Sequence, residues 1–243
     1  MMKKYFGSML CGAILLSGAA LAQAPVAPIN CMITPWREAR LAFDQPGIVA
    51  ERLVARNDRV KAGDVLLTLQ AGLAEIDLER ANVTLAALKQ RLKRSKTLTQ
   101  NNVISRDEIE KLQSEYDLAV VEVAAVEARL DKMRLLAPFD GVITGTAVEA
   151  GDLTGSAPLI TLAEIERLKA VVILPVEAWA TYALGEKLML REEVSGESRV
   201  GEIIGIDRFI DASANSFSME VSLHNADFAL LPGAACQILS RAE

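Results

Sequence analysis

The sequence predicts an elongated α+β protein: a β-sandwich made of two similar halves, interrupted by an antiparallel coiled-coil α-hairpin and followed by a small β-barrel. Three observations lead to this prediction. A short β-rich phrase occurs twice, as "FDQPGIVAER" at 43–52 and "LLAPFDGVITG" at 135–145. Between the copies, residues 73–134 contain no Gly or Pro, and the hydrophobic period changes from 2 to 3.5. After residue 164, strand patterns return between turn-rich stretches.

The N-terminus has the layout of a secretory signal peptide, which we assign to residues 1–22. Two lysines precede an apolar run at about 5–21, and Ala20 and Ala22 are the small residues before a cut. We expect cleavage after Ala22 and export to the periplasm, with an uncleaved anchor as the alternative. No later segment approaches the run of about eighteen apolar residues that spans a bilayer.

The charge of the chain argues against nucleic acid as a partner. Without residues 1–22, 24 basic and 32 acidic residues remain, a formal net charge of −8. Acidic chains with few aromatic residues lack the basic surface that nucleic-acid binding requires.

Catalytic, metal and cofactor sites are not expected either. His224 is the one histidine, and it has no neighbouring residues with metal-ligand spacing. General-base catalysis usually recruits a histidine or a buried carboxylate, whereas we interpret Glu192 and Glu193 as a solvated strand end. No Gly-rich phosphate loop occurs. The sequence therefore predicts no enzyme and no cofactor.

The two halves of the sandwich are assigned to residues 37–70 and 136–163. Aligning Gly47 with Gly141 gives an offset of 94 that also matches apolar and turn positions: Val49 with Ile143, Val54 with Val148, and Asp58 with Asp152. Because neither half buries a face alone, we expect the halves to pack on each other.

Residues 71–135 are assigned to the hairpin. The first helix carries its seam at Ala74, Leu78, Ala81, Leu85, Leu88, Leu92, Ser95 and Thr99, and the second at Ile109, Leu112, Tyr116, Ala119, Val123, Val126, Leu130 and Met133. The other positions are mostly charged, polar or alanine. Each arm should reach about 40 Å. Ser105 followed by Glu108 is a capping box that should begin the second helix.

The remaining segments are a lead-in at 23–36, which could contribute to the barrel, and the barrel itself at 164–243. Strands are expected at "LKAVVIL" (168–174) and at four later segments, with a short helix at "PVEAWATYAL".

Paired β halves are also the plan of biotinyl and lipoyl domains, which carry a cofactor on a lysine in the turn joining the halves. Here the hairpin replaces that turn, and Lys61 belongs to a different one. A swinging-arm carrier is therefore not expected.

"PGIVAERLVARNDRVKAGDVLLTL", the hairpin, "LLAPFDGVITGTAVEAGDLTGSAPLITL" and the following barrel resemble the membrane fusion proteins, bacterial periplasmic adaptors related to haemolysin secretion protein D and to multidrug efflux adaptors. The resemblance runs from about residue 37 to 240. It implies an adaptor, in a ring of copies, that links an inner-membrane transporter of RND or ABC type to a TolC-like outer-membrane channel for export of small molecules. The competing function is an envelope scaffold that presents a coiled coil without transport.

Members of the family that meet TolC-like channels carry an Arg-x3-Leu-x6-Ser pattern at the hairpin tip, and Arg94, Leu98 and Ser105 match it. The resemblance implies polar contacts to the channel from Arg94 and Ser105, with Leu98 packed between helices. The alternatives are a solvated Arg94 and a Ser105 that acts as a helix cap. Ile109 departs from the pattern, because leucine is often found there.

The resemblance also frames the two chain ends. If the lead-in supplies a strand to the barrel, Cys31 lies beside the last strand, which holds Cys236, and a disulfide can form; two buried free thiols are the alternative. Efflux adaptors often have a membrane-proximal domain after the barrel. With few residues on either side, we expect that domain to be small or absent, which leaves the transporter class open.

Overall fold

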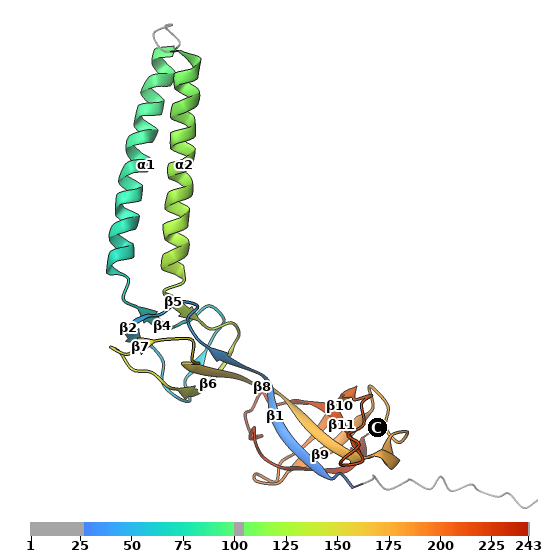
Figure 1. The fold of residues 1–243 in the computed structure, drawn as a ribbon. Coiled ribbons are helices and arrows are strands. Elements are labelled where there is room, and N and C mark those ends of the chain that lie inside the picture. Colours follow the sequence, from blue (N-terminus) through green and yellow to red (C-terminus); the bar gives the residue numbers. More distant parts are fainter. Residues whose placement is uncertain (1–26, 100–104, 243) are drawn as a thin grey trace, which may run out of the picture.

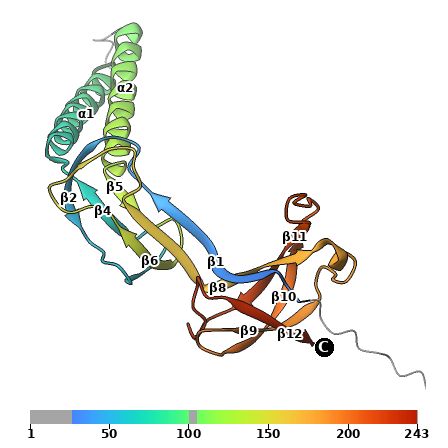
Figure 2. The ribbon, with the colours of Figure 1, turned by 60° about the horizontal axis from the view of Figure 1, so that its bottom comes forward.

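The computed structural model describes residues 27–99 and 105–242, so the predicted signal peptide lies outside the described residues. The described chain forms three parts in a bent row: a helical hairpin, a β-module at its foot, and a second β-module at the far end (Figure 1). The turned view of Figure 2 shows the bend between the two β-modules. Among the described residues, no helix is both long and apolar enough to cross a membrane.

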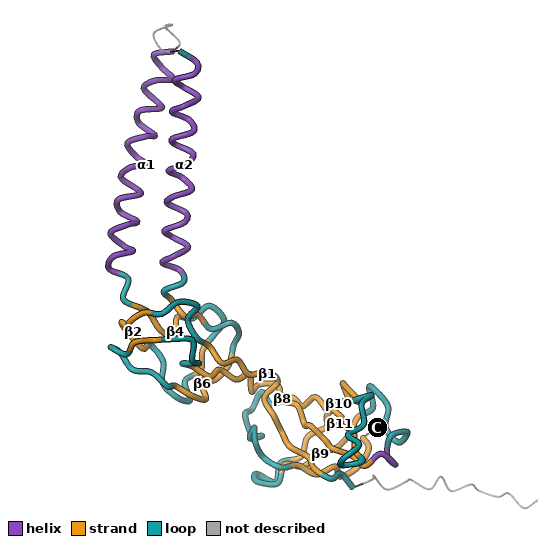
Figure 3. The backbone as a smooth tube through the Cα atoms, in the orientation of Figure 1, coloured by secondary structure: helices purple, strands orange, loops and turns teal. Residues whose placement is uncertain are grey.

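The hairpin consists of α1 (Gly72–Thr99) and α2 (Arg106–Asp131), which run antiparallel (Figure 3). Every predicted seam residue with a described side chain is buried or half-buried, while their neighbours are mostly exposed. Ser105 N-caps α2, because its Oγ accepts a hydrogen bond from the Glu108 N–H at 3.2 Å. The helix ends before Met133, whose side chain packs against the core of the neighbouring β-module instead of extending the seam.

The module at the foot of the hairpin, called here the repeat module, is built from six strands. They are β2 (Gly47–Arg52), β3 (Arg59–Val60), β4 (Val65–Leu69), β5 (Arg134–Leu136), β6 (Gly141–Thr146) and β7 (Leu153–Thr154). One sheet has the order β5–β4–β2–β7, and β3 pairs with β6. Strands from the two sequence repeats thus pair with each other, β2 with β7 and β3 with β6.

The turns of the repeat module show the duplication at the level of single hydrogen bonds. The Asp58 carboxylate accepts the Ala55 N–H at 2.7 Å, and the Asp152 carboxylate accepts the Glu149 N–H at 2.8 Å. Asn57 and Gly151, which correspond at the offset of 94, both have positive φ, 73° and 95°. Both halves therefore repeat the same aspartate-capped turn with a left-handed residue before the aspartate.

The far module, called the barrel module, contains β9 (Lys187–Glu192), β10 (Ser198–Ile206), β11 (Ser216–His224) and β12 (Cys236–Ala242). These strands join β8 (Ile160–Pro175) in the order β12–β9–β10–β11–β8, and β1 (Asn30–Leu41) pairs with β8. A bridge between Met32 and Ala235 brings β1 back toward β12. The predicted short helix is a single 3-10 turn, η1 (Val176–Ala178).

Strands β1 and β8 serve both modules, which the sequence did not predict. β8 pairs with β6 up to Ala163 and with β11 from Arg167 onward. The expected boundaries at 36/37 and 163/164 both fall inside these strands. The polar residues of "EIER" look like the end of a strand, but they lie where the two-stranded ribbon is open to solvent, and pairing with β1 continues on both sides of them.

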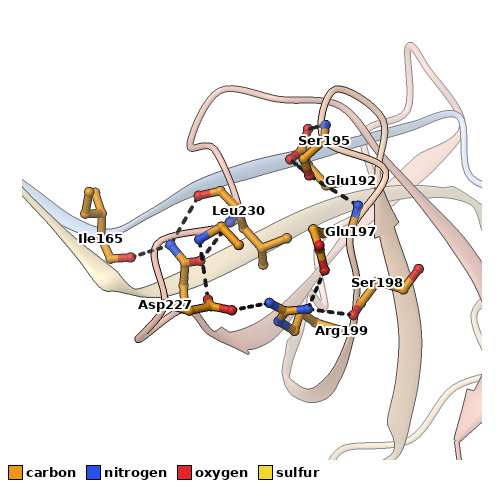
Figure 4. Close-up of polar contacts among 10 residues, drawn as sticks. Ile165, Glu192, Ser195, Glu197, Ser198, Arg199, Asp227 and Leu230 are labelled. Carbon is orange, nitrogen blue, oxygen red and sulfur yellow. Dashed lines mark hydrogen bonds and ion pairs between the residues drawn. The ribbon is translucent and has the colours of Figure 1, made fainter.

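Two further features of the barrel module concern the candidate residues. Cys31 and Cys236 form a disulfide bond that joins β1 to β12. The interpretation of Glu192 as a solvated strand end was wrong, because its side chain is fully buried. Its carboxylate accepts hydrogen bonds from the Ser195 N–H and hydroxyl groups (Figure 4) and from the Val194 N–H. A buried carboxylate with this set of donors acts as the cap of the β9–β10 turn.

Candidate functional site

The hairpin tip is the predicted site, and the structure places two of its three residues. Arg94 is exposed near the end of α1, and Ser105 is exposed at the start of α2. Leu98 belongs to α1, but its side chain lies outside the described residues. Arg94 and Ser105 therefore share the end of the molecule that is farthest from the β-modules (Figure 1). The hydroxyl of Ser105 is engaged as the N-cap of α2.

The tip half of the hairpin is electrically polarised, a feature that sequence reasoning missed. Residues 81–99 of α1 contain no acidic residue and five basic ones: Lys89, Arg91, Lys93, Arg94 and Lys96. The facing part of α2, residues 106–122, contains two basic residues and six acidic ones: Asp107, Glu108, Glu110, Glu115, Asp117 and Glu122. One edge of the tip is therefore basic and the other acidic. Counting charges for each helix separately would have shown this.

The base and middle of the hairpin have apolar outer faces. On α1, Leu73, Ile76 and Val83 are at least 62% exposed. On α2, Leu118 and Val121 are at least 65% exposed and continue into exposed Ala125 and Ala128. The 3-4-3 spacing of the α2 set places it on one stripe opposite the buried seam. The same spacing is visible in the sequence. It was not predicted as a second apolar face because the buried seam already accounted for the helix.

Exposed apolar residues also lie on the two edge strands of the repeat module and on β2 beside one of them. Ile48 and Leu153 form an exposed cross-strand pair on β2 and β7, and the Gln70 N–H that precedes α1 is bonded to the Ile48 carbonyl. Leu136, in the strand that follows α2, is 46% exposed. Because the sheet order is β5–β4–β2–β7, β5 and β7 are its two edges. We call the α1 side with β7 the first edge, and the α2 side with β5 the second edge.

Contacts between the two helices fix the relative heights of the two edges. Lys96 Nζ donates to Gln113 Oε1 at 2.9 Å near the tip, and Ala81 and Val126 line a common groove nearer the base. Residues 73–83 of α1 are therefore level with the last turns of α2, from about residue 124 onward, and Leu118 and Val121 lie about one to two turns nearer the tip. Each edge has apolar residues below its charged part, and the charged parts carry opposite signs.

Comparison with known proteins finds sequence relatives of this chain and solved structures with the same fold. The chain is 29% identical over 205 residues to the multidrug resistance protein MdtA of Klebsiella pneumoniae, covering 72% of this chain and 48% of MdtA. It is 23% identical to an uncharacterised protein of Haemophilus influenzae, covering 84% and 54%. A crystal structure of a MacA–MexA chimera that contains the Pseudomonas aeruginosa MexA α-hairpin superposes with a TM-score of 0.78 at 17% identity, covering 88% and 82%. The membrane fusion protein Spr0693 of Streptococcus pneumoniae gives 0.69 at 15% identity, covering 88% and 99%.

The chain is similar to MdtA in sequence and to the membrane fusion proteins in fold.

No family model matches the sequence, so the relationship is carried by these relatives and by the shared fold. The chain spans about half the length of the relatives that it matches.

The other residues singled out in the sequence have structural positions in this chain. The Lys61 N–H is bonded to the Asp64 carboxylate in the turn between β3 and β4, whereas the hairpin is inserted between β4 and β5. His224 is exposed and ends β11 opposite Arg167. Within residues 27–99 and 105–242, no group of three or more His, Cys, Asp or Glu is placed to hold a metal ion.

Proposed function

We propose that this protein is the periplasmic adaptor of a tripartite efflux or secretion system, linking an inner-membrane transporter to a TolC-like outer-membrane channel for export of small molecules. The observation that carries the proposal is the geometry of the hairpin. A 28-residue helix rises about 42 Å, and it is packed along its length against an antiparallel partner. Such a rod holds its polar tip well away from the β-modules, as a bridge between two membrane proteins requires.

At the tip, Arg94, Leu98 and Ser105 are proposed to contact the end of the channel. Arg94 offers an always-charged planar donor that can bind carboxylates or carbonyl oxygens with two parallel hydrogen bonds. The barrel module at the opposite end would face the transporter, of RND or ABC type. The signal segment would bring the mature protein to the periplasm, where it associates with the inner membrane through that transporter.

The two edges support a ring of copies. If hairpins stand side by side in the same direction, the first edge of one copy meets the second edge of the next at the same height. Apolar base then meets apolar base, and the basic tip of α1 meets the acidic tip of α2. An interface between two different patches of one protein closes into a ring when the rotation between copies permits.

The docking proposal is tested by charge reversal at the tip. Arg94→Glu should abolish crosslinking between the hairpin tip and the outer-membrane channel of the same cell envelope, and should stop export of the system's cargo. Arg91→Glu is the matched control, because it makes the same charge change three residues away on exposed surface. Unchanged crosslinking in Arg94→Glu, with both variants present at normal amounts, would reject the docking role and favour a scaffold that presents the hairpin to another partner.

A further inference from the structure

The junction between the repeat module and the barrel module is a narrow ribbon. β6 leaves β8 after Ala163 and β11 joins it at Arg167, so Glu164–Glu166 have neither neighbour on that side. On the other side, the register with β1 shifts between Pro35 and Arg37, at Trp36. We call Trp36 and Glu164–Glu166 the waist. Two strands with interrupted pairing bend more easily than the sheets on either side.

Side chains at the waist stay with one module each. Arg37 donates to Glu164 at 2.5 Å and lies over the Phe139 ring of the repeat module at 4.1 Å. Trp36 lies under Arg167, 3.8 Å from its guanidinium carbon, on the barrel side. These contacts stiffen each end of the ribbon, but they do not tie one module to the other across the bend.

A loop of the barrel module is clamped onto the waist by Asn225, which is fully buried. Its backbone N–H donates to the Glu166 carbonyl at 2.8 Å, and its Nδ2 donates to the Ile165 carbonyl at 2.9 Å. Its Oδ1 accepts the Leu230 N–H at 2.9 Å, which closes the loop 225–230 on itself. Figure 4 labels Ile165 and Leu230, the residues to which Asn225 is bonded.

The same loop is held from its outer side. Asp227 forms an ion pair with Arg199 of β10, and Arg199 also binds Glu197 at 2.8 Å (Figure 4). Phe228 adopts φ of +56°, a conformation that non-glycine residues rarely keep without surrounding restraints. The restraints on both sides direct its ring outward from the barrel module.

The Phe228 ring meets the repeat module. The guanidinium carbon of Arg59, in β3, lies 3.9 Å from its centre. Beside this contact lies a cleft of about 300 Å³, lined by Val60 and Asp140 of the repeat module and by Glu166 and Ala226. The modules are therefore not packed face to face at the inside of the bend, and Arg59 and Phe228 join them outside the ribbon.

We propose that the waist is a hinge and that the Arg59–Phe228 contact is a latch that holds one angle between the hairpin-bearing repeat module and the barrel module. With the latch closed, Phe228 holds Arg59 of β3 against the loop 225–230, and Asn225 of the same loop is bonded to the waist. The position of β3 relative to the waist is then fixed. With the latch open, the ribbon sets the angle alone and the cleft can widen or close. This proposal does not depend on the efflux role.

Distance distributions between spin labels test the latch. Labels on Lys89→Cys in α1 and Arg208→Cys in the barrel module, both at exposed positions, report the angle in the full chain with Cys11→Ser and the native disulfide intact. A cation–π contact at an exposed site corresponds to a population change of about two- to five-fold. Arg59→Ala and Phe228→Ala should broaden the distribution and lower the ratio of molecules in the native peak to those outside it by that factor, whereas Phe228→Tyr, which keeps a ring, should restore it.

Arg56→Ala is the matched control, because Arg56 is an exposed arginine three residues from Arg59. It should leave the distribution unchanged. The latch is rejected if the Arg59→Ala distribution superimposes on that of the native chain, or if Arg56→Ala broadens it equally. If Phe228→Ala does not fold, Arg59→Ala decides alone, because that substitution removes only an exposed side chain.

Discussion

Cys31 and Cys236 are joined by a disulfide bond although 205 residues separate them in the sequence. The bond links β1 to β12, where backbone pairing is sparse: the Ile33 N–H donates to the Ala234 carbonyl at 2.9 Å and the Gly233 N–H donates to the Ile33 carbonyl at 2.7 Å. The disulfide therefore holds β1 and β12 together where the barrel module closes.

Replacing both cysteines by serine should lower the free energy of unfolding by about 2–5 kcal/mol, because the unfolded chain loses a large-loop constraint. Urea unfolding of the double variant and of the native protein, the latter with and without reductant, measures this. Equal urea midpoints in all three samples would show that backbone pairing and packing alone hold β1 against β12.

Ser105 has two proposed roles, which substitution can separate. Ser105→Ala removes the N-cap of α2 and should cost about 1 kcal/mol of stability. Ser105→Asp keeps a good N-cap and adds a negative charge near the positive end of the helix, so stability should return. Thermal unfolding checks both. If the serine hydroxyl also docks to the channel, export fails in Ser105→Asp despite restored stability; normal export in that variant limits Ser105 to capping.

The two edges predict a specific crosslink between copies. Val83 on α1 and Val121 on α2 are exposed, at 64% and 65%, and lie about one turn apart in height on outer faces of one hairpin. In a chain carrying Val83→Cys and Val121→Cys, oxidation in the cell envelope should produce a ladder of covalent oligomers, since the two thiols of one copy face apart. A chain with Lys89→Cys in place of Val83→Cys is the control. Monomer alone after oxidation would exclude the edge-to-edge ring.

Glu192 predicts the acid sensitivity of the barrel module. Burial raises the pKa of its carboxyl, but hydrogen bonds from Ser195 and Val194 outweigh burial and hold the pKa below its ordinary value. A depressed folded-state pKa contributes stability that is present above the unfolded pKa of about 4.3 and is lost as pH falls through the folded value.

Glu192→Gln should therefore lower stability at pH 7 by about 1–2 kcal/mol, through loss of charge-assisted hydrogen bonds. The difference from native should shrink below about pH 4, because the native carboxyl becomes neutral as well. Denaturant unfolding at several pH values measures this, with exposed Glu193→Gln as the control. A difference that is independent of pH would assign the effect to packing.

Periodic and duplicated features of this fold were predictable from sequence, because regular spacing reports regular burial. The seam from Ala74 to Ser95 and the offset that pairs Asp58 with Asp152 are of this kind. Features set by a single long-range contact were not. Glu164–Glu166 looked like a strand end because a two-stranded ribbon exposes polar residues to water, and Glu192 looked solvated because its burial depends on the turn that folds over it.

At the candidate site, the same limit applies. Ser105 and Glu108 form a local pair, so the helix start could be predicted. The apolar outer stripe from Leu118 to Ala128 was harder to predict. One buried seam is enough to explain a helix within a single chain, so the pattern did not call for a second apolar face.

The hairpin is inserted between β4 and β5, and the two chain crossings at its foot are its attachment to the duplicated fold. Adding or deleting seven residues in each helix would preserve the seam while moving the tip by about 10 Å. The length of the rod can therefore change by whole heptads without any change to either β-module.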